Sequence, residues 1–303
     1  MHKPLFILAP PRSFTSIVCG MIGNHPEMCG LPETNLFAAD TVTGLLRIHR
    51  AQRRFRSGLL RAIAELGLGE QSEDNIDSAA DWLDEASDCT TAELFADLAD
   101  WAAPRQLVDK SPMHVYAADA VVRMKNAFPE ARFLHLLREP RGTCESIYRS
   151  SSALQAGRGR RGPARSSSGT TDPDKMWLKA HLHVIDALQD VPLERQLTLR
   201  GEDLLQAPEA HMVHIAKWLG IDAGSAAIDA MLHPERSPFA CMGPSNAPLG
   251  NDIEFLKNPA LRPYTAKPVD LSSALSWDEA LHFSADVREL AEIFGYKQTG
   301  DVG

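Results

Sequence analysis

A short apolar segment that leads directly into a basic turn and then into a helix constrains the fold of this chain more than any other feature. Its first copy begins with residues 5–8 (LFIL), which stand between Pro4 and the pair Pro10 and Pro11. Such an uninterrupted apolar run is typical of a strand buried on both faces of a parallel sheet. The residues after the turn have helical spacing: Ile17, Val18, Met21 and Ile22. The pattern predicts an α/β fold with a parallel sheet flanked by helices.

The turn between this strand and helix contains the chemistry of an anion site. Residues 12–16 (RSFTS) supply one guanidinium and three hydroxyls. The free N–H groups of a helix start point back into such a turn, where they attract phosphate or sulfate. The segment lacks the two glycines and the lysine of G-x-x-x-x-G-K-[ST], which argues against ordinary ATP or GTP chemistry. The alternative is a surface arginine beside hydroxyls that only cap the helix.

A second copy of the pattern lies in the middle of the chain. Residues 132–137 (RFLHLL) predict a buried strand, and residues 138–146 (REPRGTCES) form a basic turn before a helix over 142–148. The carboxyl ends of parallel strands share the edge where open α/β sheets bind ligands. We therefore expect the two turns to contact the same ligand.

The other elements complete one domain over residues 1–303. Residues 36–68 predict one long helix or two, and two shorter helices follow in the acidic segment 70–101, so that 36–104 forms a helical insertion beside the sheet. Ser111 and Pro112 predict a helix start. The remaining expected elements are strands at 106–110 and 196–199 and helices at 113–128, 173–188, 208–219 and 277–294.

Two stretches lack periodicity. Residues 150–172 are rich in Ser, Gly and Arg, which predicts a mobile loop. Residues 234–268 are rich in Pro, Gly and Asn. A loop of that length inside a compact domain is usually functional, so we expect a long C-terminal lid loop.

Composition excludes several classes of function. The net charge of −9 argues against general nucleic-acid binding. No apolar run approaches the ~20 residues that span a bilayer, and the N-terminus has no secretory signal pattern, which favours the cytoplasm. The five cysteines are scattered and odd in number, so they indicate neither a disulfide framework nor a cysteine metal motif.

Three segments, in this order, resemble the sulfotransferase superfamily, whose donor is 3′-phosphoadenosine 5′-phosphosulfate (PAPS). PPRSFTS resembles the family's 5′-phosphosulfate loop, and LHLLREPRGTCES resembles its 3′-phosphate motif. LTLRGEDLLQAPEAHMVHIAKWLGI resembles the L-R-Y-E-D-L segment and the helix after it. The resemblance implies a P-loop-like sheet, release of 3′-phosphoadenosine 5′-phosphate (PAP), and donor contacts from Arg12, Ser13, Phe14, Thr15, Ser16, Arg138, Ser146 and Arg200.

Two residues depart from the family pattern. Phe14 stands where many members have Gly, which would strain the backbone if that position requires a positive φ. Gly201 replaces the usual Tyr and removes one expected nucleotide contact. Neither change alters the charged groups.

Sulfuryl transfer requires in-line geometry and fixed positive groups, and it needs no metal. The resemblance implies that Arg12 stabilises the leaving 5′-phosphate. HPEMCGLPETN resembles tyrosylprotein sulfotransferases, in which a Glu at the position of Glu33 is the general base. His114 is the rival base, because it lies near the start of a predicted helix at the same sheet edge and its ordinary pKa suits base chemistry.

For the other polar candidates, a structural role is an alternative to a functional one. Asp109 and Lys110 could line the same edge as His114, or they could be a solvated strand end. His211 and His214 have a spacing that could ligate metal, but the sequence offers no third ligand.

The acceptor must carry a hydroxyl. LGNDIEFLKNPALRPY resembles sulfotransferase domains of olefin-forming polyketide synthases, which sulfate a 3-hydroxyacyl chain on a carrier protein. The arginine-rich segments 47–61 and 158–165 would suit an acidic carrier protein, although a charge run is also typical of a solvated helix face. Alternatives are a carbohydrate, lipid or peptide hydroxyl. Outside sulfotransferases, a nucleotide kinase would need magnesium and a phosphate-loop lysine, and a non-catalytic nucleotide-binding module would bind without transfer.

Overall fold

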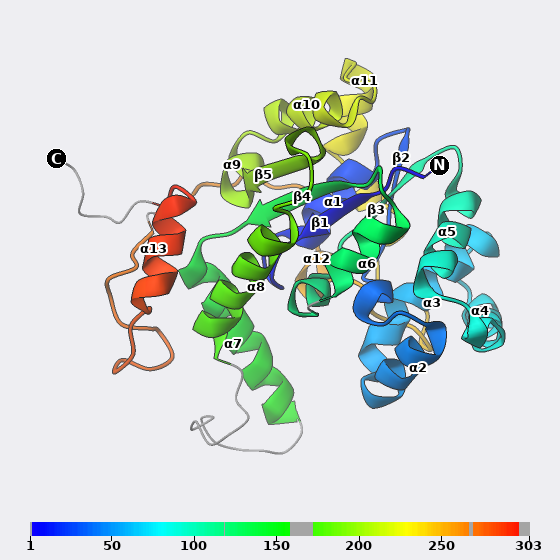
Figure 1. Ribbon diagram of the computed structural model, residues 1–303, viewed down its shortest axis with the longest axis horizontal. Helices are drawn as coiled ribbons and strands as arrows, with labels where there is room; N and C mark the ends of the chain where they lie inside the picture. The colour runs from blue at the N-terminus through cyan, green and yellow to red at the C-terminus, as the bar shows by residue number, and fades with distance from the viewer. Residues whose placement is uncertain (1, 118, 158–171, 267–268, 297–303) are drawn as a thin grey trace.

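The computed structural model describes residues 2–117, 119–157, 172–266 and 269–296. Its centre is a parallel five-stranded sheet in the order β2-β3-β1-β4-β5, which confirms the predicted α/β fold (Figure 1). The strands are β1 Leu5–Leu8, β2 Met28–Gly30, β3 Gln106–Asp109, β4 Arg132–Leu137 and β5 Gln196–Arg200. The sequence patterns missed β2, because three residues are too few to give a strand signal.

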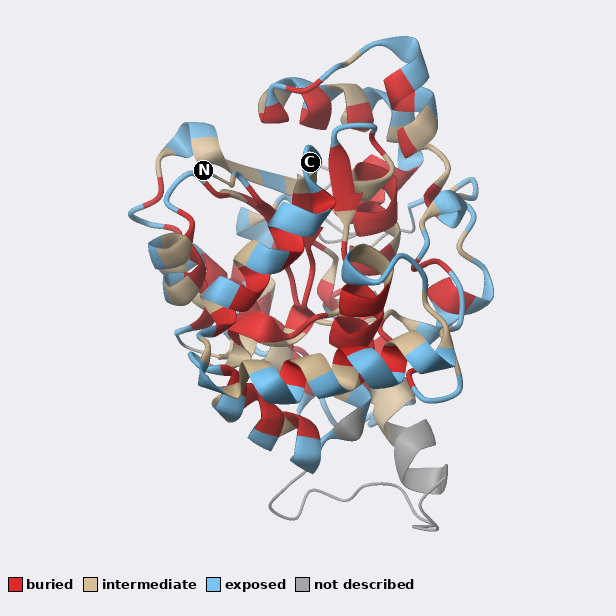
Figure 2. Cartoon of the chain, turned by 90° about the vertical axis from the view of Figure 1, so that its right-hand side faces the viewer, coloured by how far each residue is buried: buried red, intermediate tan, exposed pale blue. Residues whose placement is uncertain are grey.

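Strand β1 connects the two faces of the sheet. Successive side chains of a strand point to opposite faces, so Leu5 and Ile7 belong to one apolar core, and Phe6 and Leu8 belong to the other. All four are at most 2% exposed, and Figure 2 shows the buried strands between helices whose outer sides are exposed. The helices of the first core include α1 Thr15–Gly23, α10 Pro208–Leu219 and α11 Ser225–Met231. Those of the second include α5 Thr91–Ala102, α6 Ala120–Ala127 and α8 Pro173–Ala187.

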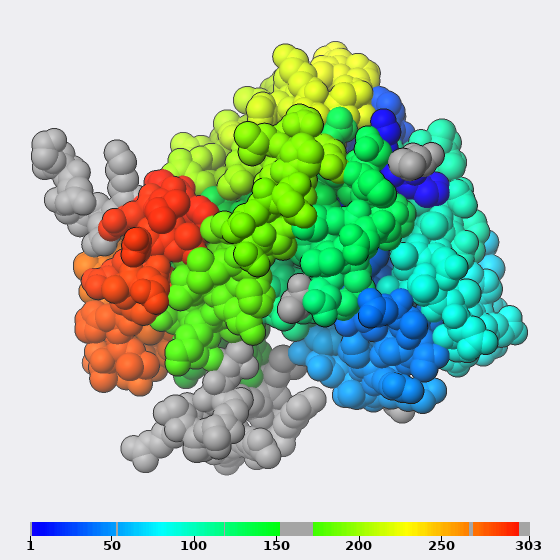
Figure 3. Space-filling view, in the orientation of Figure 1, coloured from blue at the N-terminus to red at the C-terminus, as the bar shows by residue number. Residues whose placement is uncertain are grey.

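A group of helices connects β2 to β3, where the sequence predicts a helical insertion. Hydroxyl N-caps begin three of them: Thr41 accepts from the N–H of Gly44, Ser72 from that of Asn75, and Thr90 forms a capping box with Glu93. In the space-filling view this segment lies at the end opposite the C-terminal helix (Figure 3). Its elements before α5 are η1 Leu36–Ala38, α2 Val42–Ala51, η2 Arg53–Phe55, α3 Arg56–Gly67, α4 Glu73–Glu85 and η3 Ala86–Asp88.

The predicted helix over residues 113–128 is wrong in its first half. The chain forms a 3₁₀ turn, η4 Pro112–Tyr116, and α6 starts only at Ala120. The tight turn buries Pro112, His114 and Val115, and the chain then extends at Ala117, which breaks any continuous helix.

Two other helices have different bounds from those predicted. Helix α7 runs over Pro140–Gly157, because no glycine or proline interrupts residues 143–156. Ser150 is accommodated in this helix because its Oγ bonds the carbonyl of Ser146 one turn earlier. Residues 150–157 are therefore helical, and residues 158–171 of the predicted mobile loop lie outside the described residues. The last helix, α13 Ala285–Ile293, starts later than predicted, because Ser284 caps it by accepting from the N–H of Val287.

The C-terminal third is largely irregular. The stretch predicted as a lid contains the short helices η6 Pro234–Arg236 and α12 Ile253–Lys257, and the apolar residues Phe255 and Leu256 fix α12 on the protein. Residues 267 and 268 of that stretch lie outside the described part. The other short helices are η5 Leu193–Arg195 and α9 Gly201–Gln206. Among the described residues, no helix combines the length and apolarity that crossing a membrane requires.

Candidate active site

Charged side chains follow four neighbouring strands at one edge of the sheet. Glu33 comes shortly after β2, Lys110 after β3, Arg12 after β1 and Arg138 after β4. A cavity of about 1560 Å³ lies at this edge. Most of the predicted site residues line it: Arg12, Ser13, Phe14, Thr15, Ser16, Glu33, Arg138 and Ser146.

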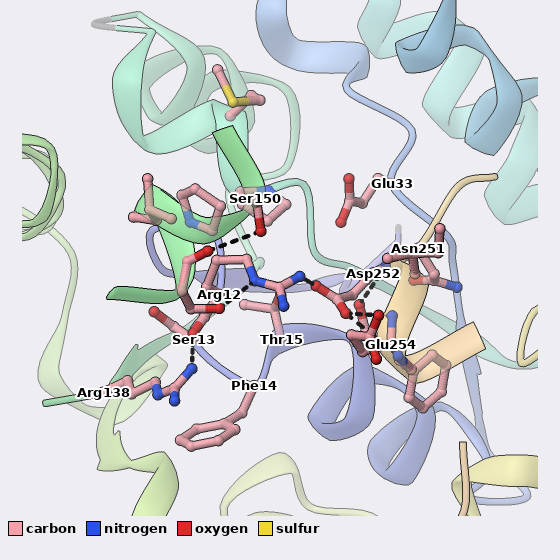
Figure 4. Close-up of a pocket in the computed structure, with 18 of the residues that line it drawn as sticks. Arg12, Ser13, Phe14, Thr15, Glu33, Arg138, Ser150, Asn251, Asp252 and Glu254 are labelled. Atoms are coloured by element: carbon pink, nitrogen blue, oxygen red, sulfur yellow. Dashed lines mark hydrogen bonds and ion pairs between the residues drawn. The ribbon is translucent and has the colours of Figure 1, made fainter. Parts of the chain in front are cut away.

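The two basic turns are joined by direct hydrogen bonds. Arg12 Nε donates to Ser146 Oγ at 2.8 Å, and Arg138 Nη1 donates to the carbonyl oxygen of Arg12 at 2.5 Å (Figure 4). Strands β1 and β4 are neighbours in the sheet, so the turns that follow them meet at its edge. The structure thus brings together the two segments that the sequence predicts to share a ligand.

The first turn has an unusual backbone. Arg12 has a φ of 68° and Phe14 a φ of 61°, so both occupy the left-handed region that favours glycine. Helix α1 starts directly after Phe14, and its first N–H groups have no partner within the helix. Ser13 Oγ is buried at the cavity and has no hydrogen-bond partner among the described residues. An orphaned hydroxyl beside free N–H groups fits an anionic ligand.

Glu33 is tied to the first turn by a buried lysine. Lys110 Nζ donates to Glu33 Oε1 at 2.8 Å and to Ser16 Oγ at 2.9 Å. The Lys110 side chain is fully buried, whereas that of Glu33 remains 27% exposed toward the cavity. The sequence signal for Lys110 is a charged residue directly after a buried strand, and it did not reveal this contact.

A buried network holds the Glu33 segment from its other side. Thr34 Oγ1 donates to Asp109 Oδ1 at 2.8 Å, and Ser111 Oγ accepts the N–H of Asn35 at 2.9 Å. Burial raises the pKa of Asp109 to about 6, although the hydrogen bonds from Thr34 and Ser111 act in the opposite direction. The segment that carries Glu33 is therefore fixed by side chains that directly follow β3.

His114 does not line the cavity. Its ring is buried, with Nδ1 3.5 Å from Asp109 Oδ2, and Nε2 has no partner among the described residues. Burial lowers the pKa of His114 to about 3, so the ring is neutral at ordinary pH. The 3₁₀ turn directs this residue into the core, where a regular helix was expected to place it near the cleft.

Arg200 is also separate from the cavity. Its Nε donates to Asp203 Oδ2 at 2.7 Å and its Nη1 to the carbonyl oxygen of Gly295 at 2.8 Å. Its contacts join the end of β5 to the C-terminal segment. The described residues contain no cluster of three potential metal ligands, and Nδ1 of His211 lies 2.9 Å from the carbonyl oxygen of Ala207.

The segment before α12 adds an acidic residue that the sequence patterns missed. Asp252 forms an ion pair with Arg12 Nη1, and its N–H donates to Ser16 Oγ at 3.2 Å (Figure 4). The neighbouring Gly250 carbonyl accepts the N–H of Glu33 at 2.6 Å. Burial lowers the pKa of Arg12, but the residue keeps a carboxylate partner in this arrangement.

Comparison with known proteins shows similarity to sulfotransferases in sequence and in fold. Residues 4–224 match the sequence model of the Sulfotransferase family. A sulfotransferase domain from the curacin biosynthetic pathway has a TM-score of 0.77 at 20% identity, covering 98% of this chain and 99% of that domain. A sulfotransferase domain from the Synechococcus PCC 7002 olefin synthase has a TM-score of 0.74 at 23% identity, covering 98% of this chain and 97% of that domain.

A more distant structure shares the same architecture. The sulfotransferase STF9 from Mycobacterium avium has a TM-score of 0.51 at 15% identity, covering 99% of this chain and 78% of that protein. No curated protein sequence matches the chain. At these identities the structural likenesses show the fold.

Proposed function

Because the chain belongs to the sulfotransferase family, we propose that it moves a sulfuryl group from PAPS to an acceptor hydroxyl. The observation that carries this proposal is the junction of the two basic turns, in which Arg12 bonds Ser146 and Arg138 bonds the backbone of Arg12. A nucleotide phosphorylated at both its 5′ and 3′ positions needs positive charge at two adjacent places. These two turns supply it at the ends of neighbouring strands.

The residues present fit such a donor. The N–H groups at the start of α1, the orphaned hydroxyl of Ser13 and the guanidinium of Arg12 would bind the 5′-phosphosulfate. Arg138 and Ser146 would bind the 3′-phosphate. Thr15 and Ser16 line the same turn and add hydroxyl donors.

Glu33 is the proposed general base. Its carboxylate would accept the acceptor's proton while the acceptor oxygen bonds to sulfur and the bond from sulfur to the 5′-phosphate breaks. Lys110 holds the carboxylate in place, and Arg12 would stabilise the charge that develops on the departing PAP. The bond between Lys110 and Ser16 links the base to the donor loop, so both reacting groups have a common support.

For the acceptor, we propose a hydroxyl on an acyl chain attached to a carrier protein. Two similar structures with TM-scores above 0.7 are sulfotransferase domains from the curacin pathway and from an olefin synthase, and both likenesses cover 97% or more of each chain. Basic residues among those that line the cavity would attract an acidic carrier protein: Arg54, Arg149, Lys175 and Lys179. The arginine-rich residues 158–165 lie outside the described part of the chain.

Calorimetric titration with PAP and with ATP tests the donor. We expect PAP to bind more tightly, because Arg138 and Ser146 have a 3′-phosphate to contact only in PAP. Tighter binding of ATP would contradict the proposal and favour a kinase. If the protein bound PAP but transferred no sulfuryl group from PAPS to any hydroxyl, a non-catalytic nucleotide-binding module would be favoured.

A transfer assay with PAPS tests the acceptor class. We expect a mass increase of one sulfuryl group on a carrier protein loaded with a 3-hydroxyacyl chain. The same acyl chain as a free thioester is the matched control. Transfer to a carbohydrate, lipid or peptide hydroxyl in place of the loaded carrier protein would assign a different acceptor.

A further inference from the structure

Phe14 has a backbone conformation that a bulky residue rarely adopts. Its φ of 61° and ψ of 10° lie in the left-handed region. For a residue with a Cβ atom this conformation is strained. Such strain persists only where the surroundings fix it, and it is frequent at ligand sites.

The ring of Phe14 lies against the guanidinium of Arg138. Arg138 Cζ is 4.5 Å from the ring centroid, which is within the range of a cation–π interaction. Tyr264 contacts the same ring edge to face, with centroids 5.7 Å apart. The ring is thus held between an arginine of the second basic turn and a tyrosine of the C-terminal segment.

Arg138 keeps its positive charge available. Its Nη1 donates a hydrogen bond to the carbonyl oxygen of Arg12. Within the described ranges it forms no salt bridge with a carboxylate, in contrast to Arg12, which pairs with Asp252. An aromatic face orients a planar guanidinium without neutralising it, so the N–H edge remains able to bind phosphate.

Gly201 makes room for the ring. A Cβ atom at this position would lie 2.5 Å from Cδ2 of Phe14, closer than van der Waals contact allows. Any larger residue at 201 would therefore displace the ring from Arg138. The phenylalanine and the glycine together form one structural feature, although one follows β1 and the other follows β5.

We propose that Phe14 is a positioning residue that holds Arg138 at the cavity and thereby selects a nucleotide carrying a 3′-phosphate. This inference rests on the proposed function, since it concerns the same donor site. A ring that only filled space would be replaceable by leucine. A ring that stacked on the base would affect every adenine nucleotide equally.

Calorimetric titration with PAP and with adenosine 5′-monophosphate (AMP) tests the inference. The quantity measured is the ratio of the two dissociation constants, because damage to the loop weakens both ligands and leaves their ratio unchanged. We expect Phe14→Leu to lower the preference for PAP about 5- to 20-fold, from the strength of a cation–π contact. Phe14→Tyr should retain the preference.

Arg138 provides a further control. In an Arg138→Ala background, Phe14→Leu should change the ratio no further, because the two residues act through one contact. If Phe14→Leu left the ratio of the two dissociation constants unchanged, either by weakening the binding of PAP and AMP equally or by weakening neither, the inference would be overturned. If the unaltered protein bound PAP no better than AMP, the proposed function itself would fail, and the two failures are thus distinguishable.

Gly201 gives a second route that does not alter Phe14. We expect Gly201→Ala to lower the PAP preference in the unaltered protein, because the new methyl group displaces the ring. In a Phe14→Gly background the same substitution should leave the ratio unchanged. A loss of preference of the same size in both backgrounds would contradict the link between the two positions. Melting temperatures of all variants establish that they fold.

Discussion

At the level of single residues, the contact between Glu33 and Lys110 supports the choice of Glu33 as the proposed base. Lys110 is fully buried, so its charge is little screened by water, and it fixes one oxygen of Glu33 at 2.8 Å. The Asp252 carboxylate also reaches the cavity, but it is paired with Arg12. Glu33 is therefore held close to the proposed donor loop by Lys110, and in the described part of the chain it forms no ion pair with Arg12.

Glu33→Gln tests this role. The amide keeps the size of the side chain but cannot accept the proton, so we expect kcat to fall about 10²- to 10⁴-fold. The affinity for PAP should change little. Asp172→Asn, at another carboxylate that lines the cavity, is the matched control and should retain activity. An active Glu33→Gln enzyme would exclude Glu33 as the base.

Asp252 competes with an anionic donor for Arg12. The side chains of Arg12 and Asp252 are 22% and 24% exposed, so their ion pair contributes about 1 kcal/mol. Asp252→Asn keeps a good N-cap for α12 and removes the charge. We expect PAP to bind roughly fivefold more tightly, measured by calorimetry. Asp190→Asn, at a carboxylate that pairs with Lys125 away from the cavity, should have no such effect. Weaker binding of PAP to the Asp252→Asn variant would show that Asp252 helps the proposed donor site.

The sequence indicates the proposed donor loop because its signal is local. Arg12, Ser13 and the start of α1 lie within one strand–turn–helix pattern, and Arg138 lies in the second copy. The bond between Asp252 and Ser16 joins residues 236 positions apart, and no local pattern reports such a pair. The structure was needed to place Lys110 beside Glu33 for the same reason.

At the level of elements, helix α3 contacts both Glu33, the proposed base, and the segment before α12. Gly58 and Arg61 are three residues apart and share one helix face. A Cβ atom at Gly58 would lie 2.1 Å from the carbonyl oxygen of Glu33. Arg61 is fully buried and its Nη1 donates to the carbonyl of Leu249 at 3.0 Å. One helix of the segment between β2 and β3 therefore positions two parts of the site.

Gly58→Ala should displace Glu33. The helix cannot accept the extra methyl group without moving the backbone that carries the base, so we expect kcat to fall roughly 10- to 100-fold. Gly44→Ala is the control, because its Cβ would meet mainly the Ala39 side chain, away from the cavity. The measurement is steady-state transfer together with PAP affinity. Equal activity of the two variants would contradict this role of α3.

Element boundaries were harder to predict than the elements themselves. The strands β1 and β4 are continuous apolar runs, whereas the end of α7 lies in a serine-rich segment, and serines can favour either a helix or a loop. In the structure Ser150 stays helical, with its Oγ bonded to the carbonyl of Ser146. The break at Ala117 similarly follows from the burial of His114 and Val115, which depends on the core beneath them. Tertiary packing, which a local pattern lacks, set these boundaries.

At the level of the whole molecule, four buried histidines link stability to pH. Burial lowers the pKa of His49 to about 4 and the pKa values of His114 and His135 to about 3. The pKa of His181 is also lowered, by burial and by His135, whose ring nitrogen lies 2.8 Å away. In the unfolded chain these rings bind protons near pH 6.5. The unfolded state therefore takes up more protons below that pH.

The sign of the effect follows from this difference. A group whose pKa is lower in the folded state loses stability as pH falls from about 6.5 toward its folded value. Three carboxyls act in the opposite direction, because burial raises the pKa of Asp109 to about 6 and also raises the pKa values of Glu139 and Asp174. The four histidines all titrate between pH 7.5 and 5 in the unfolded chain and outweigh these carboxyls, so we expect the free energy of unfolding to decrease over this range.

His49 allows one of these contributions to be isolated. Both ring nitrogens are buried without a hydrogen-bond partner among the described residues, so leucine can replace the ring without breaking a bond. Urea unfolding at pH 7.5 and pH 5 should show that His49→Leu loses about 2 kcal/mol less stability on acidification than the unaltered protein. The exposed His214 provides the control, and His214→Gln should keep the original pH dependence. If His49→Leu and the unaltered protein lost the same stability, His49 would have to be protonated in the folded state, and burial would not control the acid response of the core.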